Sequence, residues 1–248
     1  TTAGTGSETD GGAVITNPDT HEKTGVFGPG TMPVLAIIDP ELMVSVPSQF
    51  KAYQGFDALF HSTEGYISAS RNEFSKMVAA EAIRNVSRNL AETIRNPENI
   101  DAMSSVALGS YLSGIQMAVG SCTSAHPLEH ALSAYHEKLP HGAGLIMISK
   151  AYYSHFVKQH VCDDRFIEMA KLMGIEDADK PEDFIRALVK LQEDCGGSEL
   201  KMSDYGIEPS EFPEMIQNAR NTLGVNFSNA PCQRADEDCV AIYQNSYR

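Results

Sequence analysis

Basic residues are scarce in this sequence, with 19 Lys and Arg against 33 Asp and Glu and a formal net charge of −14. Proteins that bind a nucleic acid backbone instead gather Lys and Arg on one face. Long apolar runs are also missing, because stretches such as Gly144–Ser149 fall far short of the roughly 20 residues that span a bilayer, and no signal segment opens the chain. We therefore expect neither a nucleic acid nor a membrane as a partner.

The sequence has little cysteine, and its five cysteines do not suit a disulfide framework. They are odd in number, widely scattered and without any CxxC spacing: Cys122, Cys162, Cys195, Cys232 and Cys239. This pattern fits reduced thiols better than secreted disulfides, so we expect a cytoplasmic protein. The chain also lacks internal repeats and low-complexity segments.

The first 45 residues differ from the rest. β-branched runs at Ala13–Thr16 and Val34–Ile38 alternate with turn sequences, which predicts strands and loops. From Pro47 onward the pattern becomes helical, with a start signal at Pro47-Ser48. We therefore divide the chain into a strand-and-loop region, residues 1–45, and an all-helical domain, residues 46–248.

Apolar residues between Phe74 and Leu90 recur at spacings of three and four, which predicts a helix there. Further helices are expected over 98–119, 121–136, 141–157, 163–173, 181–194, 208–222 and 235–246. The apolar stripe of the 181–194 helix, which includes Phe184 and Leu188, is interpreted as a packing face. The predicted fold is mainly α: a helical bundle preceded by a short region of strands and loops.

Acidic and histidine residues cluster in two motifs. The first, GFDALFHSTEGY, places Asp57 four residues before His61, and the second, AHPLEHALSAYHEKLPHG, holds four histidines. Residues at i and i+4 share a helix face, so Asp57 and His61 can aim at one point. Pro140 breaks the chain, and we expect a new helix to begin at His141. The possible metal ligands are Asp57, His61, His126 and His141.

Three imidazoles and one carboxylate suit a borderline divalent ion such as Zn²⁺ or Fe²⁺, whereas Mg²⁺ or Ca²⁺ prefers an all-oxygen set. Taken alone, Asp57 and His61 would more often be a pair on a helix surface. The joint pattern of four ligand-type residues favours the metal site. His136 is interpreted as a solvated helix residue.

These motifs resemble the iron-containing (group III) alcohol dehydrogenase family. TTAGTGSE at the start and FSNAPCQRADEDCVAIYQNSYR at the end resemble further parts of that family, in its order and over the whole chain. The resemblance implies the same four metal ligands, Fe²⁺ or Zn²⁺ as the metal, and NAD(P). Family members have an upstream α/β domain with a Gly-Gly-Gly-Ser phosphate loop. This sequence has no such run, so we expect residues 1–45 to be the remnant of a dinucleotide domain that is mostly missing, as in a truncated protein.

The resemblance also implies a cofactor contact in the opening segment, where glycines let backbone N–H groups approach a phosphate. Segments rich in Gly and Thr are otherwise more often plain loops. The residues expected to contact the cofactor are Thr1, Thr2, Gly4, Thr5, Gly6 and Ser7. His130 has no ligand role in the family and is our candidate catalytic residue, as a proton relay or nicotinamide contact with a pKa near neutrality.

The implied function is hydride transfer between a primary alcohol and NAD(P), with the divalent metal as a Lewis acid. The expected partner is a small-molecule alcohol or aldehyde, and a homo-oligomer is left open. One alternative is a catalytically silent metal-binding fragment. Another is a metal-dependent hydrolase, for which His130 and Glu64 are the nearby candidate bases.

Overall fold

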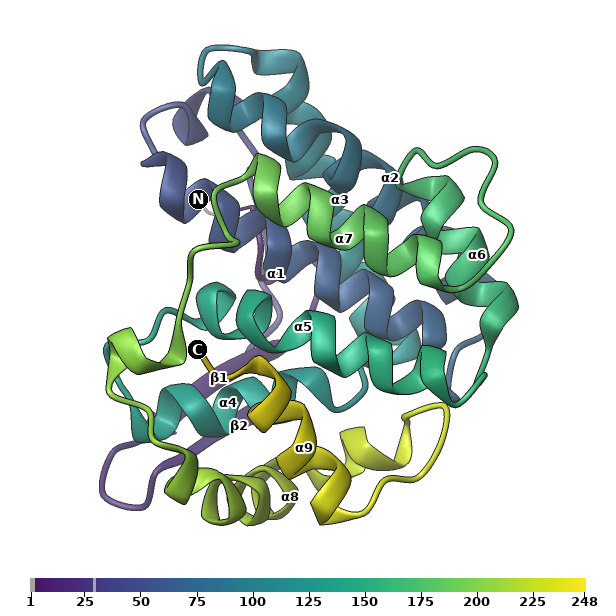
Figure 1. The fold of residues 1–248 in the computed structure, drawn as a ribbon. Helices are drawn as coiled ribbons and strands as arrows, with labels where there is room; N and C mark the ends of the chain where they lie inside the picture. The colour runs from purple at the N-terminus through teal and green to yellow at the C-terminus, as the bar shows by residue number, and fades with distance from the viewer. Residues whose placement is uncertain (1–2, 29) are drawn as a thin grey trace.

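The computed structural model describes residues 3–28 and 30–248, and this part of the chain is mainly helical (Figure 1). Its nine α-helices are α1 (Ser48–Ile67), α2 (Glu73–Arg95), α3 (Ile100–Gly120), α4 (Ala125–Tyr135), α5 (His141–Lys158), α6 (Asp163–Leu172), α7 (Glu182–Asp194), α8 (Phe212–Ser228) and α9 (Asp236–Ser246). Short 3-10 helices cover η1 (Pro40–Met43), η2 (Met202–Tyr205) and η3 (Pro209–Glu211). The predicted fold class is confirmed, as is the helix start after Pro47.

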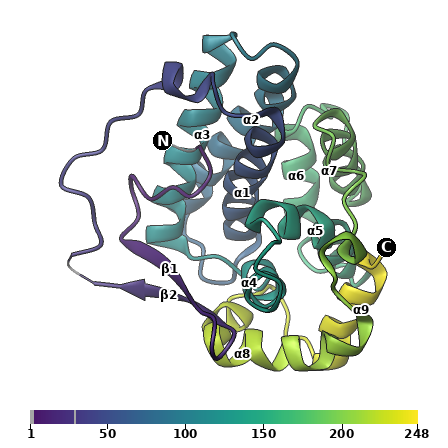
Figure 2. The same ribbon diagram turned by 90° about the vertical axis from the view of Figure 1, so that its left-hand side faces the viewer.

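The described strands form one antiparallel hairpin, β1 (Gly12–Asn17) with β2 (Glu22–Phe27). The strand expected at Ala13–Thr16 is confirmed, but the one expected at Val34–Ile38 is wrong. Figure 2 shows residues 30–39, which lead to η1, running clear of the helices. Val34 is fully exposed, because no described strand lies beside it to pair with its backbone or cover its side chain.

The helices pack as two connected groups (Figures 1 and 2). Helices α1, α2 and α3 contact one another, and α5 packs on the other side of α1. Helix α4 lies between α5 and α8, α9 covers α5 and α8, and α6 with α7 closes the end near α2 and α5. One apolar core runs through both groups.

Helix ends follow local signals. Asn72 and Ser75 form a capping box at the start of α2, and Asn99 caps α3 by accepting a hydrogen bond from the Ala102 N–H. The helix predicted from residue 208 instead begins as η3 and continues as α8, which is kinked at Leu223. These differences leave the order of the helices as predicted.

Helix α1 is the central helix and is buried almost all round. Contacts with α2, α3 and α5 cover its faces. Its polar side chains, including Asp57, His61 and Glu64, therefore lie in the interior and need partners there. Asp57 is 6% exposed and His61 is 7% exposed, so the two residues are not a pair on the helix surface.

Gly142, in the first turn of α5, brings that helix against the backbone of α1. A Cβ atom at this position would lie 2.3 Å from the carbonyl oxygen of Tyr53 and 2.7 Å from its carbonyl carbon. Backbone cannot rotate away as a side chain can, so we expect Gly142→Ala to lower the free energy of unfolding by about 3 kcal/mol. Urea unfolding of the native and variant proteins measures the change.

Gly224→Ala is the matched control, because no heavy atom lies within 4 Å of a Cβ built there. We expect that variant to be unchanged or more stable by up to about 1 kcal/mol. Equal losses in the two variants would contradict the close approach of α5 to α1.

Candidate metal centre

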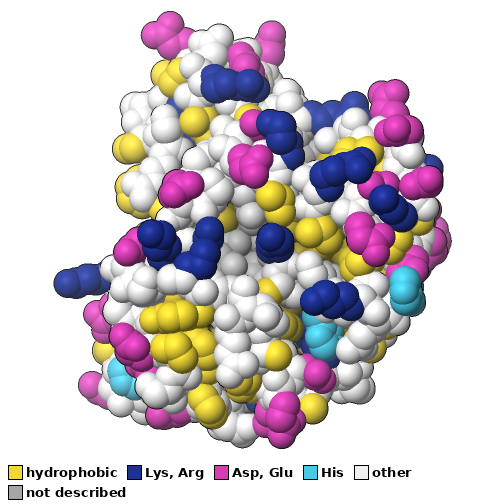
Figure 3. Space-filling model, viewed as in Figure 1, with side chains coloured by type: hydrophobic (Ala, Val, Ile, Leu, Met, Phe, Trp, Pro, Cys, Tyr) yellow, Lys and Arg dark blue, Asp and Glu magenta, His cyan; other side chains and the backbone are white. Residues whose placement is uncertain are grey.

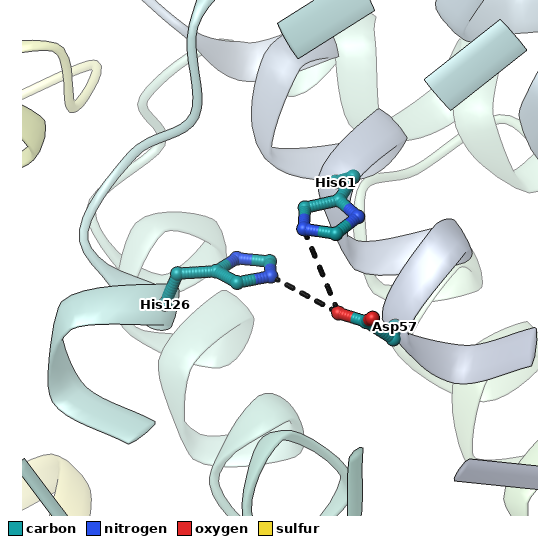
Figure 4. Close-up of side chains that lie close together, drawn as sticks. All are labelled: Asp57, His61 and His126. Atoms are coloured by element: carbon teal, nitrogen blue, oxygen red, sulfur yellow. Dashed lines mark hydrogen bonds and ion pairs between the residues drawn. The ribbon is translucent and has the colours of Figure 1, made fainter. Parts of the chain in front are cut away.

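Three histidine side chains converge on one carboxylate oxygen, that of Asp57. Asp57 Oδ1 lies 3.6 Å from the Nε2 atom of His61, one turn along α1. It lies 3.3 Å from the Nε2 atom of His126, in the first turn of α4, and 3.3 Å from that of His141, the first residue of α5. Figure 4 shows the first three of these residues with their side chains pointing toward one another. The structure therefore places the three histidines predicted as metal ligands around the fourth predicted ligand, Asp57.

Local structure places each ligand. The helical repeat of α1 sets Asp57 and His61 on the same face. Pro140 adopts an extended conformation, with φ −65° and ψ 136°, and α5 begins directly after it. His141 thus sits at a helix end whose direction is fixed by packing.

The spacing of these atoms fits a metal ion. Metal–ligand bonds of 2.0–2.2 Å in tetrahedral geometry place neighbouring ligand atoms roughly 3.3–3.6 Å apart. The three distances from Asp57 Oδ1 fall in this range. The ligand atoms of Asp57, His61 and His126 also lie within 4.8 Å of one another, whereas His141 forms a second such group with Glu129 and His130. One oxygen and three nitrogen donors suit Zn²⁺ or Fe²⁺ better than Mg²⁺ or Ca²⁺.

Two fully buried carboxylates hold the rings of two histidines from behind. Glu64 accepts hydrogen bonds from Thr123 N (3.0 Å), Thr123 Oγ1 (2.9 Å) and Ala125 N (3.1 Å), and its other oxygen contacts His126 Nδ1. Glu129 contacts His141 Nδ1 in the same way. An ionised carboxylate only accepts, so these Nδ1 atoms carry the protons and Nε2 is left for a metal.

The local charge also suits a divalent cation. Three buried carboxylates, Asp57, Glu64 and Glu129, face one nearby ammonium group, that of Lys23, whose Nζ lies 3.6 Å from Glu129 Oε2. Metal ligation requires neutral imidazoles, and with these rings neutral the three carboxylates and one ammonium group leave a net charge of −2 in the interior. Buried charges without partners are costly, and one divalent ion would neutralise them.

The pKa values show how strongly the groups interact. Burial alone would raise the pKa of Asp57, but the His61 and His141 imidazoles bring it well below its usual value. Burial lowers the pKa of His61 to about 4. Burial acts in the same direction on His126, but Glu64 and Asp57 overcome it and raise that pKa to about 10. The pKa values of the three carboxyl groups, Asp57, Glu64 and Glu129, all lie below their usual values, so these groups are ionised around neutral pH.

His130 lies one turn after His126, with its ring centroid 5.2 Å from that of His141. Burial, followed by the charges of His141 and Lys23, lowers its pKa well below the usual value. This lowered value corrects the expectation that the pKa of His130 lies near neutrality. A cation bound nearby would lower that pKa further. His130 is a neutral imidazole at pH 7.

His136 is also corrected. It caps the end of α4, its side chain is only 14% exposed, and its Nε2 lies 3.2 Å from Glu211 Oε2. The sequence suggested a solvated residue because the turn before α8, which covers it, lies some 75 positions away in the chain.

The opening segment packs against the helices through its glycines. Thr1 and Thr2 lie outside the described residues. Gly6 has φ +64°, and a Cβ there would lie 2.6 Å from Gly114 Cα on α3. Thr5 and Ser7 are exposed, with hydroxyl oxygens 2.9 Å apart. The buried glycines, Gly4 and Gly6, therefore anchor the loop, while its hydroxyls face outward.

Three functional residues were missed or assigned another role from the sequence. Glu64 was considered only as a general base, and Glu129 and Lys23 were not singled out. Glu64 follows His61 by three residues and Glu129 follows His126 by three, so each shares a helix face with a ligand. That spacing was the available signal, whereas Lys23 depends on how the hairpin docks.

The surface carries mixed charge. On the face shown in Figure 3, Lys and Arg side chains are scattered among Asp and Glu. None of the described helices combines the length and apolar character needed to cross a membrane. All five cysteines are free, as their spacing predicts.

Comparison with known proteins gives the same family throughout the chain. Residues 51–247 match the Fe-containing alcohol dehydrogenase family, C-terminal, and residues 1–40 match iron-containing alcohol dehydrogenase. A 1,3-propanediol dehydrogenase of Klebsiella pneumoniae is 30% identical over 253 positions, covering 100% of this chain and 64% of the relative. A long-chain primary alcohol dehydrogenase of Thermoanaerobacter ethanolicus is 28% identical, covering 99% and 62%.

Among solved structures, the alcohol dehydrogenase from Oenococcus oeni superposes with a TM-score of 0.90 at 31% identity. The match covers 100% of this chain and 64% of that one. The chain thus spans slightly less than two thirds of the length of these relatives. The match over residues 51–247 shows the family, and the cluster of histidines and carboxylates is consistent with it: this chain belongs to the iron-containing alcohol dehydrogenase family.

Proposed function

We propose that this chain is the metal-binding catalytic part of an alcohol dehydrogenase, which transfers hydride between a primary alcohol and NAD(P) and reduces aldehydes in reverse. The observation that carries the proposal is the convergence of three imidazole nitrogens on Asp57 Oδ1. Relatives named for 1,3-propanediol and for long-chain primary alcohols support this substrate class. Residues 46–248 would form the catalytic domain, and residues 1–45 would contribute the cofactor loop.

The metal, Fe²⁺ or Zn²⁺, would be held by Asp57, His61, His126 and His141. When bound, it supplies a Lewis acid that makes an alcohol hydroxyl more acidic. Glu64 and Glu129 keep two of the ligand rings oriented.

His130 is proposed as the proton relay. Its neutral ring beside His141 could accept the hydroxyl proton, and NAD(P)⁺, when bound, would supply the hydride acceptor. Alcohol and NAD(P)⁺ would thereby give aldehyde, NAD(P)H and one proton. The outward hydroxyls of Thr5 and Ser7, on a loop anchored by Gly4 and Gly6, support a role in holding the cofactor.

Metal content and turnover test the proposal together. After oxygen-free purification, elemental analysis should find about one iron or zinc per chain. The protein loaded with metal should then oxidise NADH or NADPH in the presence of a short-chain aldehyde. Stoichiometric metal without turnover would support the silent metal-binding fragment instead, and turnover of esters without nicotinamide would support the hydrolase.

His130→Gln separates binding from catalysis. We expect it to keep the metal, because its nitrogens are not among the atoms facing Asp57, and to reduce turnover by about 100-fold through loss of the relay. Steady-state rates and metal content measured on the same preparation check both statements. Unchanged turnover would remove His130 from the mechanism.

A further inference from the structure

Lys23 reaches the metal centre from outside the helical bundle. It lies on β2, and its Nζ donates a hydrogen bond to Ser133 Oγ at 2.8 Å. The same atom lies 3.6 Å from Glu129 Oε2 and 3.4 Å from His141 Nδ1. Its side chain is only 14% exposed, so this ammonium group is held within the site.

The hairpin is docked on both sides of Lys23. The His21 ring stacks on Tyr135 of α4 at 4.6 Å between centroids, and Asn218 of α8 donates a hydrogen bond to the His21 carbonyl. Thr24 donates a hydrogen bond to the carbonyl of Thr222 at 3.2 Å. Two helices thus fix the backbone before and after Lys23.

Glu129 needs this cation. It is fully buried, and one of its oxygens, Oε1, has no hydrogen-bond partner in the part of the chain that the structure describes. The Lys23 ammonium is the one Lys or Arg group within 4 Å of its carboxylate among residues 3–28 and 30–248. A buried carboxylate without a cation is costly, so the position of Glu129 behind the His141 ring depends on its contact with Lys23.

We infer that Lys23 is a positioning residue of the metal centre: acting through Glu129, it holds the His141 ring so that Nε2 points at Asp57. This inference rests on the proposed metal site and adds a residue outside the bundle to it. Docking of the hairpin and binding of the metal are then coupled, and each strengthens the other by the same factor.

Zinc affinity of the folded protein tests the inference. In Lys23→Met we expect the Kd for Zn²⁺, measured by chelator competition at fixed pH, to rise by roughly 10–100-fold. Lys23→Arg, which keeps the charge, should recover part of the affinity. Lys138→Met is the matched control, because Lys138 is exposed in the loop before α5. The zinc affinity of this variant should equal that of the native protein.

A double variant tests the route through Glu129. If Lys23 acts through Glu129, Lys23→Met combined with Glu129→Gln should bind zinc no more weakly than Glu129→Gln alone. Two independent, additive losses would contradict that route. Hydrogen exchange gives a reading on the native chain: zinc should slow exchange of the amides in residues 12–27, and Lys23→Met should lose this effect.

The outcomes are distinguishable. If the native chain binds no zinc, the proposed function fails before Lys23 is tested by affinity. If the native chain binds zinc and Lys23→Met binds it equally well, the proposed function stands and the role of Lys23 is overturned. If Lys23→Met does not fold, zinc-dependent protection of residues 12–27 in the native chain decides, and its absence overturns the coupling.

Discussion

Asp57→Ala is expected to remove metal binding altogether. Its Oδ1 atom faces the Nε2 atoms of His61, His126 and His141 at 3.3–3.6 Å, and it is the oxygen donor of the proposed ligand set. The loss should exceed the roughly 10–100-fold that removal of an outer partner costs. Elemental analysis should find about one metal ion in the native chain and none in the variant.

Thermal unfolding gives a second measurement. At free zinc 100 times the Kd, binding should stabilise the native chain by about 2.7 kcal/mol. For a chain of this size that raises Tm by roughly 5–11 °C. Asp57→Ala should show no rise.

Two further variants serve as controls for this experiment. Asp57→Asn keeps the shape of the side chain and should also bind far more weakly, because its amide oxygen carries no negative charge. Asp177→Ala removes an exposed carboxylate and should retain the full metal content and the full zinc-dependent rise in Tm. Stoichiometric metal in Asp57→Ala would rule out this centre.

The ligands could be predicted from the sequence because each depends on local geometry. The spacing of Asp57 and His61 fixes a shared helix face, and Pro140 fixes a helix start at His141. The family resemblance then selected His126 over His130. The structure supplied what spacing alone could not, the convergence of α1, α4 and α5 on one point.

The residues behind the ligands could not be predicted, because their partners are distant in the chain. Glu64 meets Thr123 and His126 some 60 residues later, and Lys23 meets Glu129 across more than 100 residues. The wrong strand at Val34–Ile38 has the same origin. A β-branched run indicates that a strand can form there, but a neighbouring strand must supply the pairing.

Glu64→Ala is expected to cost the most stability of any single change at the site. Its carboxylate is fully buried and accepts from Thr123 N, Thr123 Oγ1 and Ala125 N, with the His126 ring on its other oxygen. Truncation leaves these donors in the interior without an acceptor. Breaking a buried charged pair costs about 4 kcal/mol, which lowers Tm by roughly 8–16 °C in a chain of this length.

Glu81→Ala is the matched control, since that carboxylate is 46% exposed and contacts Arg84 and Asn85 on the same helix. It should change the free energy of unfolding by no more than about 0.5 kcal/mol. Because the carboxylate of Glu64 meets the backbone as well as a ligand ring, its loss should appear even with chelator present. If Glu64→Ala matches Glu81→Ala in chelator and differs only with zinc, the carboxylate orients His126 for the metal without holding the start of α4 in place.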